Sequence, residues 1–380
     1  MQGHIYRRQK PDGSYTRWRA VIDLPPDASG RRRQRTTSHD TKRDAQAWLA
    51  RTTTELRAGE TYDNKVTVAQ YLTDWLSTKQ AIRPSTRLGY ARHIEQIFIP
   101  ELSHLKLADL RAKHIAAVFQ RIVDSNHARE RPINARTQRS ILATLNSALN
   151  TAVRQGLIRR NPAATVELPR PEKPSTTVWS RDEAALFLTG IHDDHLHVLY
   201  RLLLLTGMRR GEGIGLQWGD LALDTGTLTI TRQVTSINGQ LHVGPPKSDS
   251  GRRTIAVDKA TLELLKAMHR RAVLAHPWEP DAHFDTRPAF PNDSGGHYSP
   301  TYVSRHFLTL VNQLGLPRIR LHDLRHTSAS LGLEGGESLL SVSRRLGHSS
   351  ISITADVYSQ ITPAGAERAA DHLATTITGT

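Results

Sequence analysis

The stretch Thr206-Gly207-Met208-Arg209-Arg210-Gly211-Glu212 follows a strongly apolar helix that the sequence predicts over residues 197–205. Gly207 is expected to end that helix, because glycine adopts backbone conformations that other residues avoid. Glu212 lies three residues after Arg209, so its carboxylate can pair with the guanidinium of a buried arginine and orient it. An Arg–Glu pair alone is more often structural than functional, so further residues must decide.

Two further motifs with histidine or arginine side chains lie toward the C-terminus. In Leu321-His322-Asp323-Leu324-Arg325-His326, an imidazole and a guanidinium are three residues apart and share one face if the segment is helical. In Leu346-Gly347-His348-Ser349-Ser350, a second histidine follows a glycine, and Tyr358 comes ten residues after His348. Tyrosine by itself is an ordinary amphipathic residue, so only the combination is informative.

These pieces belong to a predicted C-terminal domain over residues 175–380, which reads as mixed and mainly α (α+β). Ser180 to Glu183 has the pattern of a capping box at a helix start, and residues 262–271 predict another helix. Residues 228–231 and 253–257 predict strands. The Pro-rich, charged segment 169–174 before this domain is a predicted boundary.

The preceding residues, 65–168, predict an all-α domain of four or five helices. Val68, Tyr71, Leu72 and Trp75 fall on one helical face, and Asn161-Pro162 ends the pattern. Residues 59–65 look like a linker to what comes before.

Residues 1–60 predict a small β-rich N-terminal domain with one helix. Polar and apolar residues alternate over 4–8 and 15–22, the very basic segment 31–37 predicts a third strand, and Thr41 could cap a helix that ends near Arg57. The chain is therefore expected to be multidomain.

The charge of this 380-residue chain is basic and unevenly distributed. Fifty-one Lys and Arg against 36 Asp and Glu give a net charge of +15, and the pI is about 10.3. The excess lies in the first 175 residues, while the rest is neutral overall. This segregation favours a polyanionic partner, double-stranded DNA above all, held by the N-terminal half. The candidate DNA-binding side chains are Arg31, Arg32, Arg33, Arg35, Arg83, Arg87, Arg136 and Arg139.

Several function classes are excluded. The chain has no cysteine, so disulfides, zinc–cysteine sites and cysteine nucleophiles cannot occur. No long apolar run predicts a membrane span, and the polar, basic N-terminus does not resemble a secretory signal, so a cytoplasmic location is expected. The stretch His192-Asp193-Asp194-His195-Leu196-His197 suggests a metal site, but a solvated turn before a helix explains it better, and no metal is expected.

Taken in order, Thr-Gly-Met-Arg-x-x-Glu, His-Asp-Leu-Arg-His, Leu-Gly-His-Ser and Tyr resemble the motifs of the tyrosine recombinase (phage integrase) family. Residues 245–255 look like that family's β-hairpin with its catalytic lysine, here Lys247. Residues 1–60 resemble its arm-type DNA-binding domain, 65–168 its helical core-binding domain, and 175–380 its catalytic domain. The likeness thus covers nearly the whole chain.

The resemblance implies a site-specific recombinase that breaks DNA with a tyrosine, forms a 3′-phosphotyrosyl bond, and needs no metal, ATP or other cofactor. Arg209 and Arg325 would bind the non-bridging phosphate oxygens and stabilise the transition state, with Glu212 supporting Arg209. Such an enzyme integrates, or both integrates and excises, a phage or mobile element.

The same resemblance assigns the proton transfers. Tyr358 would be the nucleophile, and its hydroxyl needs help because a phenol ordinarily has a pKa near 10. His322 would accept that proton or hydrogen-bond the phosphate, His348 would hydrogen-bond a phosphate oxygen, and Lys247 would protonate the leaving 5′-oxygen.

Two other readings remain open on the sequence. A type IB topoisomerase shares this catalytic set and acts as a monomer, whereas a degenerate integrase would bind DNA without cutting it. The separate basic N-terminal unit favours recombination, and the filled catalytic positions argue against degeneration. The expected partners are DNA attachment sites, other copies of the chain in a homotetramer, an excisionase and a DNA-bending protein. A helix over residues 364–374 is expected to pack on its own domain or on a neighbouring protomer.

Overall fold

The computed structural model describes residues 3–24, 31–57, 66–171, 177–277, 280–352 and 355. The chain divides into two compact units, residues 1–173 and 174–380. Three of the predicted features lie outside the described residues: the linker over 59–65, Tyr358 and the helix over 364–374. Among the described helices, none is both long and apolar enough to span a membrane.

The first unit begins with a three-stranded antiparallel sheet in the order β1-β2-β3. Ala20 and Ile22 of the central strand are buried, together with Ala45 of the helix that follows the sheet. Thr41 caps this helix, since its hydroxyl accepts a hydrogen bond from the Asp44 amide at 3.1 Å. The elements are β1 (Gly3–Tyr6), β2 (Trp18–Leu24), β3 (Arg33–His39) and α1 (Lys42–Arg57).

A helical bundle with its own hydrophobic core follows in the same unit. Buried residues recur at helical spacing in α2, and the Tyr71 hydroxyl donates a hydrogen bond to the Ala148 carbonyl at 2.6 Å. A π-helical turn over Ile94–Phe98 separates the third helix from the fourth. The α-helices are α2 (Val68–Ser77), α3 (Pro84–His93), α4 (Ile99–Leu102), α5 (Ala112–Ser125) and α6 (Ala135–Arg154).

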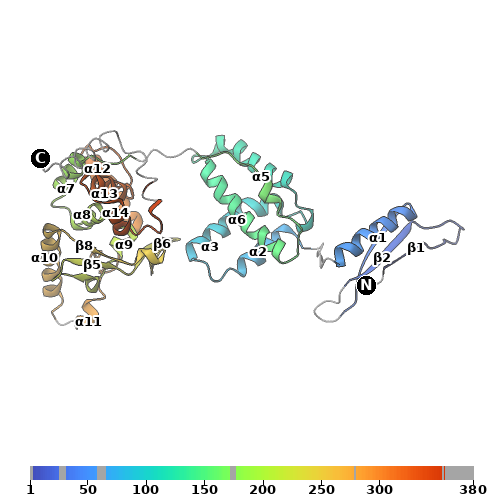
Figure 1. The fold of residues 1–380 in the computed structure, drawn as a ribbon, viewed down its shortest axis with the longest axis horizontal. Coiled ribbons are helices and arrows are strands. Elements are labelled where there is room, and N and C mark those ends of the chain that lie inside the picture. Colours follow the sequence, from blue (N-terminus) through green and yellow to red (C-terminus); the bar gives the residue numbers. More distant parts are fainter. Residues whose placement is uncertain are drawn as a thin grey trace, which may run out of the picture. The chain divides into compact units, whose positions relative to one another are not determined.

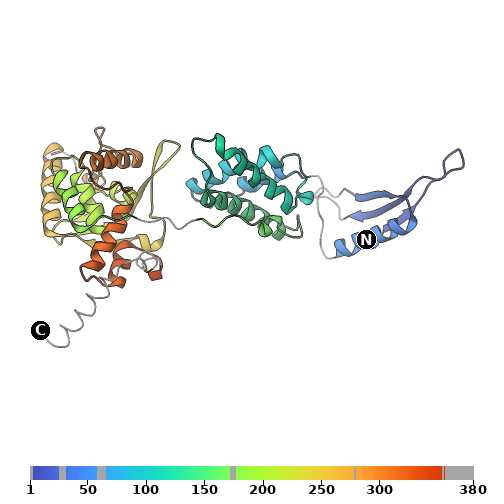
Figure 2. The same cartoon turned by 90° about the horizontal axis from the view of Figure 1, so that it is seen from above.

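The second unit is mainly helical with two small sheets, one in the order β4-β5-β8 and one formed by β6 and β7. Figures 1 and 2 show the ribbon from two directions. Its strands are β4 (Leu221–Ala222), β5 (Thr227–Ile230), β6 (Gln233–Ile237), β7 (Gln240–Gly244) and β8 (Arg253–Ala256). Its helices are α7 (Arg181–Gly190), α8 (His197–Thr206), α9 (Arg210–Ile214), α10 (Lys259–Ala275), α11 (Asp281–Phe284), α12 (Pro300–Gln313), α13 (Asp323–Glu334) and α14 (Leu339–Leu346).

Helix α8 forms the centre of this unit. Most of its side chains are buried, including Leu199 and Tyr200 at 0% exposure. They pack with an aromatic group that contains Trp179, Phe187 and Phe307. Figure 1 labels α8 between α7 and the strands β5 and β8. Because most side chains of α8 are packed in the core, both of its ends are fixed positions in the fold.

The hairpin expected around Lys247 lies earlier in the chain. Strands β6 and β7 form it, with a turn at Asn238 and Gly239, where both residues have positive φ angles of 50° and 82°. Pro245 and Pro246 follow β7, and proline has no amide proton to donate to a ladder. Lys247 therefore lies in the connection between β7 and β8, and the expectation of a hairpin over 245–255 was wrong.

Candidate active site

Gly207 lies in the connection between α8 and α9, two residues before the predicted catalytic residue Arg209. Gly207 has a φ of 66°, and a Cβ atom there would lie 2.3 Å from Leu346 Cδ2 and 3.1 Å from Ser328 Oγ. Any other residue would thus be strained in the backbone and would clash with α13 and α14. The predicted end of the apolar helix is confirmed, and the chain reverses there so that α9 starts directly after Arg209.

Glu212 is a buried carboxylate that binds two arginines of the candidate site. It is 1% exposed and accepts hydrogen bonds from the Arg209 amide at 2.8 Å, Arg209 Nη1 at 2.7 Å and Arg253 Nη2 at 3.0 Å. Burial raises the pKa of Glu212, but the two guanidinium groups outweigh it and hold that pKa below its ordinary value of 4.5. The predicted Arg209–Glu212 pair is confirmed, and the carboxylate is ionised at neutral pH.

Replacing Glu212 by glutamine is expected to lower the stability of the fold by about 3–5 kcal/mol, because two guanidinium groups lose their buried counter-charge. The stabilisation by the ionised carboxylate is complete above its ordinary pKa of 4.5 and is lost as the pH falls toward the lower folded value. The thermal unfolding midpoint measures the loss. Glu263→Gln is the matched control, since this side chain is 66% exposed and pairs with Lys266 on the surface of α10. Equal midpoints for the two variants would contradict the role of Glu212.

Arg325 is buried with one side of its guanidinium unused. The residue is 4% exposed, and its Nη1 donates a hydrogen bond to the Gly207 carbonyl at 2.7 Å. Its Nη2 has no hydrogen-bond partner among the described residues. Burial and the positive charges of Arg209 and Arg253 lower the pKa of Arg325 to about 9. A buried cation beside like charges, with a free donor, is an arrangement that an anion stabilises.

Both predicted histidines face this cationic region. His322 comes directly before α13, and His348 follows the turn after α14. His322 is exposed, yet desolvation of its ring, with the charges of His326 and Arg325, lowers its pKa to about 4. Burial, Arg325 and Arg209 lower the pKa of His348 to about 4 as well. Both rings are therefore neutral at pH 7, when each can accept one hydrogen bond and donate another.

A second glycine turn places His348. Gly347 has a φ of 67°, and a Cβ atom there would lie 2.6 Å from the Ser250 carbonyl oxygen. The Gly347 carbonyl accepts a long hydrogen bond of 3.4 Å from Arg209 Nη2. Three segments far apart in sequence thus meet at this turn: the α8–α9 connection, the segment before β8, and the end of α14.

Two predicted catalytic residues remain, Lys247 and Tyr358. Lys247 is exposed, three residues before the Ser250 carbonyl that packs against Gly347. Tyr358 lies outside the described residues. The structure therefore brings together Arg209, Glu212, His322, Arg325 and His348, and the catalytic roles of all seven residues stay predictions.

Arg253 is a site residue that sequence reasoning missed. Besides Glu212, its guanidinium donates hydrogen bonds to the Arg345 carbonyl from Nε at 2.6 Å and to the Gly251 carbonyl from Nη1 at 3.0 Å. It therefore ties β8 to the turn that carries His348. The available signal was strand alternation, because Arg253 shares a face of β8 with the buried Ile255, and a charge on such a face needs a partner.

The candidate DNA-binding arginines occupy different environments. Arg31, Arg83, Arg87 and Arg136 are exposed, while Arg33 and Arg35 on β3 are half-buried. Arg32 is paired with Asp23 at 2.9 Å. Arg139 donates hydrogen bonds to the carbonyls of Leu168 and Pro169, at 3.1 and 3.0 Å. Its guanidinium therefore anchors the segment that leaves the bundle.

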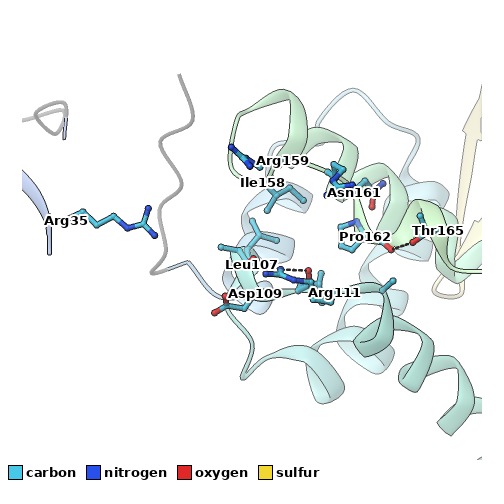
Figure 3. A pocket seen from close by; sticks show the side chains of 13 residues that line it. Arg35, Leu107, Asp109, Arg111, Ile158, Arg159, Asn161, Pro162 and Thr165 are labelled. Carbon is cyan, nitrogen blue, oxygen red and sulfur yellow. Dashed lines mark hydrogen bonds between the residues drawn. The ribbon is translucent and has the colours of Figure 1, made fainter. Parts of the chain in front are cut away.

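A pocket is formed within the first unit (Figure 3). Its helical lining comes from residues 107–112 and 158–165. Arg111 is held there by the Ala108 and Leu110 carbonyls, at 2.7 and 3.0 Å. None of the predicted catalytic residues lines this pocket, so it is not the active site.

Comparison with known proteins agrees with the geometry. The model of the phage integrase family matches residues 183–364, and that of the phage integrase N-terminal SAM-like domain matches residues 67–122. The ICEBs1 integrase of Bacillus subtilis is 26% identical over 302 residues, which are 74% of this chain and 74% of that protein. An integrase of Streptomyces ambofaciens is 26% identical over 379 residues, 94% of each chain.

Solved structures share the fold. The Tn1549 transposon integrase in complex with transposon right end DNA superposes with a TM-score of 0.68 at 20% identity, covering 81% of this chain and all of that one. A lambda integrase tetramer bound to a Holliday junction covers 92% of this chain and 94% of its own, with a TM-score of 0.57 at 20% identity.

The cationic site suits an anionic group, and the matching family models specify a protein that acts on DNA. The chain belongs to the phage integrase family. It is a tyrosine-type site-specific DNA recombinase.

Proposed function

We propose that this recombinase cleaves and religates DNA through a 3′-phosphotyrosyl intermediate with Tyr358 as the nucleophile. The observation that carries the proposal is the unused Nη2 of Arg325, which is buried beside Arg209 and has no hydrogen-bond partner among the described residues. A phosphodiester supplies two non-bridging oxygens, which two guanidinium groups can bind together. In the proposed complex, the scissile phosphate binds between Arg209 and Arg325.

The bond changes follow from this position. The Tyr358 oxygen attacks phosphorus and forms a new P–O bond, while the bond to the 5′-oxygen breaks. The phosphate keeps its ester bond to the 3′-oxygen of the DNA and so links that strand covalently to Tyr358. His322 accepts the phenolic proton, and Lys247 donates a proton to the leaving 5′-oxygen. His348 hydrogen-bonds a non-bridging oxygen, and Glu212 holds Arg209 in place. The phosphotyrosyl ester conserves the bond energy, so the reverse attack by a 5′-hydroxyl religates a strand without a cofactor.

The pKa values of the histidines support these roles. At pH 7 His322, with a pKa of about 4, is neutral and can take up a proton. The positive charge that stabilises the transition state then comes from the arginines, whose charge does not change near neutral pH. One site can therefore contain both a neutral base, His322, and permanently charged groups, the arginines.

The remaining assignments follow the charge distribution. Residues 1–60 would bind arm-type DNA sites, and residues 65–168 would bind the core site, because the excess positive charge lies in these two segments. Residues 175–380 would catalyse cleavage and religation. The recombinase would act in the cytoplasm as a homotetramer on DNA, with an excisionase and a DNA-bending protein as accessory partners. Its reaction would integrate a phage or mobile element, with excision as the reverse. The lambda integrase tetramer on a Holliday junction supports the tetramer by similarity of fold.

The decisive experiment traps the covalent intermediate. Purified protein is incubated at 25 °C with EDTA and a suicide DNA substrate whose cleaved end diffuses away, so that religation cannot occur. A denaturation-resistant adduct that mass spectrometry maps to Tyr358 is the expected result. An adduct on another residue would refute the nucleophile, and tight binding of the core site without any adduct would refute the cleavage mechanism.

Deleting residues 1–60 tests the proposed division of labour. Binding to distal arm-type sites is expected to be lost, because the basic strand β3 is removed. Cleavage of the core-site substrate should stay within about tenfold, since the deletion removes none of the catalytic side chains. Gel-shift assays and adduct yields measure the two effects, with the full-length chain as reference. Loss of core cleavage together with arm binding would contradict separate domains.

A further inference from the structure

A second cluster of polar side chains lies outside the active site of the catalytic unit. Asp194 and His195 lie in the turn between α7 and α8, and His306 lies on α12. Each offers one ligand atom, and these atoms all lie within 4.8 Å of one another. The first two belong to the histidine-rich stretch that sequence analysis explained as a solvated turn, while the third comes from far along the chain.

The carboxylate of Asp194 is held between the two imidazole rings. Its Oδ1 accepts a hydrogen bond from the Leu196 amide at 2.8 Å and lies 3.7 Å from His195 Nδ1. Its Oδ2 lies 3.3 Å from His306 Nε2. The ring centroids of the two histidines are 4.9 Å apart, with an interplanar angle of 62°. The carboxylate oxygens of Asp194 thus lie near a ring nitrogen of each histidine.

The Tyr200 hydroxyl contacts one ring nitrogen of His306, and Asp194 contacts the other. Its hydroxyl donates to the Val303 carbonyl at 3.0 Å and lies 3.0 Å from His306 Nδ1. A hydroxyl has one proton, so the Tyr200 oxygen accepts from Nδ1–H when that proton is on Val303. In a neutral ring with the proton on Nδ1, Nε2 carries a lone pair and lies 3.3 Å from Asp194 Oδ2. Two such lone pairs repel one another unless a cation lies between them.

We propose that Asp194, His195 and His306 bind a divalent transition-metal ion, with Zn²⁺ as the preferred occupant. Two imidazoles and one carboxylate are a common zinc ligand set, and Zn²⁺ favours tetrahedral coordination. The exposed position of His195 leaves the fourth coordination position to water. The Tyr200 hydroxyl supplies the outer contact that ligating histidines usually have.

The site is separate from the proposed chemistry. It lies at the start of α8, whereas Gly207 and Arg209 lie beyond its other end, and a helix of ten residues is about 15 Å long. A metal ion there would link the turn before α8 to α12. Its expected effect is therefore on the stability of the catalytic unit, and adduct formation at 25 °C should proceed with a chelator present. A failed test of zinc binding would therefore leave the cleavage mechanism standing, and a missing DNA adduct would leave the zinc site standing.

The test uses the full-length chain, stripped with EDTA and exchanged into metal-free buffer. Isothermal titration calorimetry with ZnCl₂ is expected to show one high-affinity site per chain. The unfolding midpoint should rise by roughly 5–10 °C at a Zn²⁺ concentration a hundred times the dissociation constant. Absence of stoichiometric binding, or binding without a rise in the midpoint, would overturn the proposal.

Variants separate this site from adventitious binding by the other histidines. His195→Ala changes an exposed side chain and is expected to weaken Zn²⁺ binding by at least about 100-fold. Tyr200→Phe keeps the buried ring and should weaken binding by about 10–100-fold through His306. His192→Ala is the matched control from the same turn, since His192 pairs with Asp193 at 3.0 Å and is not in the cluster. Equal losses in the His192 and His195 variants would show binding by surface histidines only and overturn the site.

Discussion

Replacing Tyr358 by phenylalanine is expected to abolish the covalent protein–DNA adduct completely. The aromatic ring is retained, but the oxygen that would form the phosphate ester is gone, so no residual rate through this route remains. DNA binding should stay within about threefold, because contacts of Lys and Arg with phosphates dominate affinity. Denaturing gels measure the adduct, and fluorescence anisotropy measures binding to the same substrate.

Tyr302→Phe is the matched control for this variant. Tyr302 lies on α12 and is 44% exposed, and its hydroxyl lies 3.4 Å from His195 Nε2. Its removal is expected to leave the adduct yield unchanged. An adduct that persists in the Tyr358 variant, or disappears in the Tyr302 variant, would show that the nucleophile is wrongly assigned.

Replacing Arg325 by lysine is expected to slow DNA cleavage by about 100- to 1,000-fold, the cost of losing one preorganised donor to a developing charge. The guanidinium reaches the Gly207 carbonyl with Nη1 and keeps Nη2 for the phosphate, and a single ammonium group cannot occupy both positions. Single-turnover cleavage of the suicide substrate measures the rate. The affinity for DNA should fall far less than the rate, because one contact among many is changed.

Arg318→Lys provides the comparison, since Arg318 is exposed and lies just before the same helix. Its cleavage rate should stay within about twofold of the parent. Circular dichroism shows whether the Arg325 variant keeps its fold. A folded Arg325→Lys protein that cleaves at the parent rate would refute the assignment of the phosphate site to this guanidinium.

Some parts of the site were predictable because their causes are local. The ends of α8 and α14 follow from Gly207 and Gly347, whose positive φ angles are accessible to glycine at little cost. The pairing of Arg209 with Glu212 follows from a spacing of three residues at a helix start. The Ser180–Glu183 capping box is present, with the Ser180 amide donating to Glu183 Oε2 at 2.7 Å.

Other parts depended on contacts between distant segments. The hairpin was misplaced because Pro245 and Pro246 lie inside the segment that resembled it, and strand β8 pairs with β5 across the intervening residues. Arg253 was missed because its partners, Glu212 and the Arg345 carbonyl, come from elements that only folding brings to it.

Four features could be read from the sequence without a structure: the residue types of the chemistry, their order, the helix ends and the uneven distribution of positive charge. The tertiary structure alone decided which side chains share a site. It gave Arg325 a buried position with one unused donor, lowered the pKa values of His322 and His348, and added His306 to the pair Asp194–His195. Desolvation and like-charge repulsion are properties of the packed interior, and they arise only when segments far apart in sequence exclude water together.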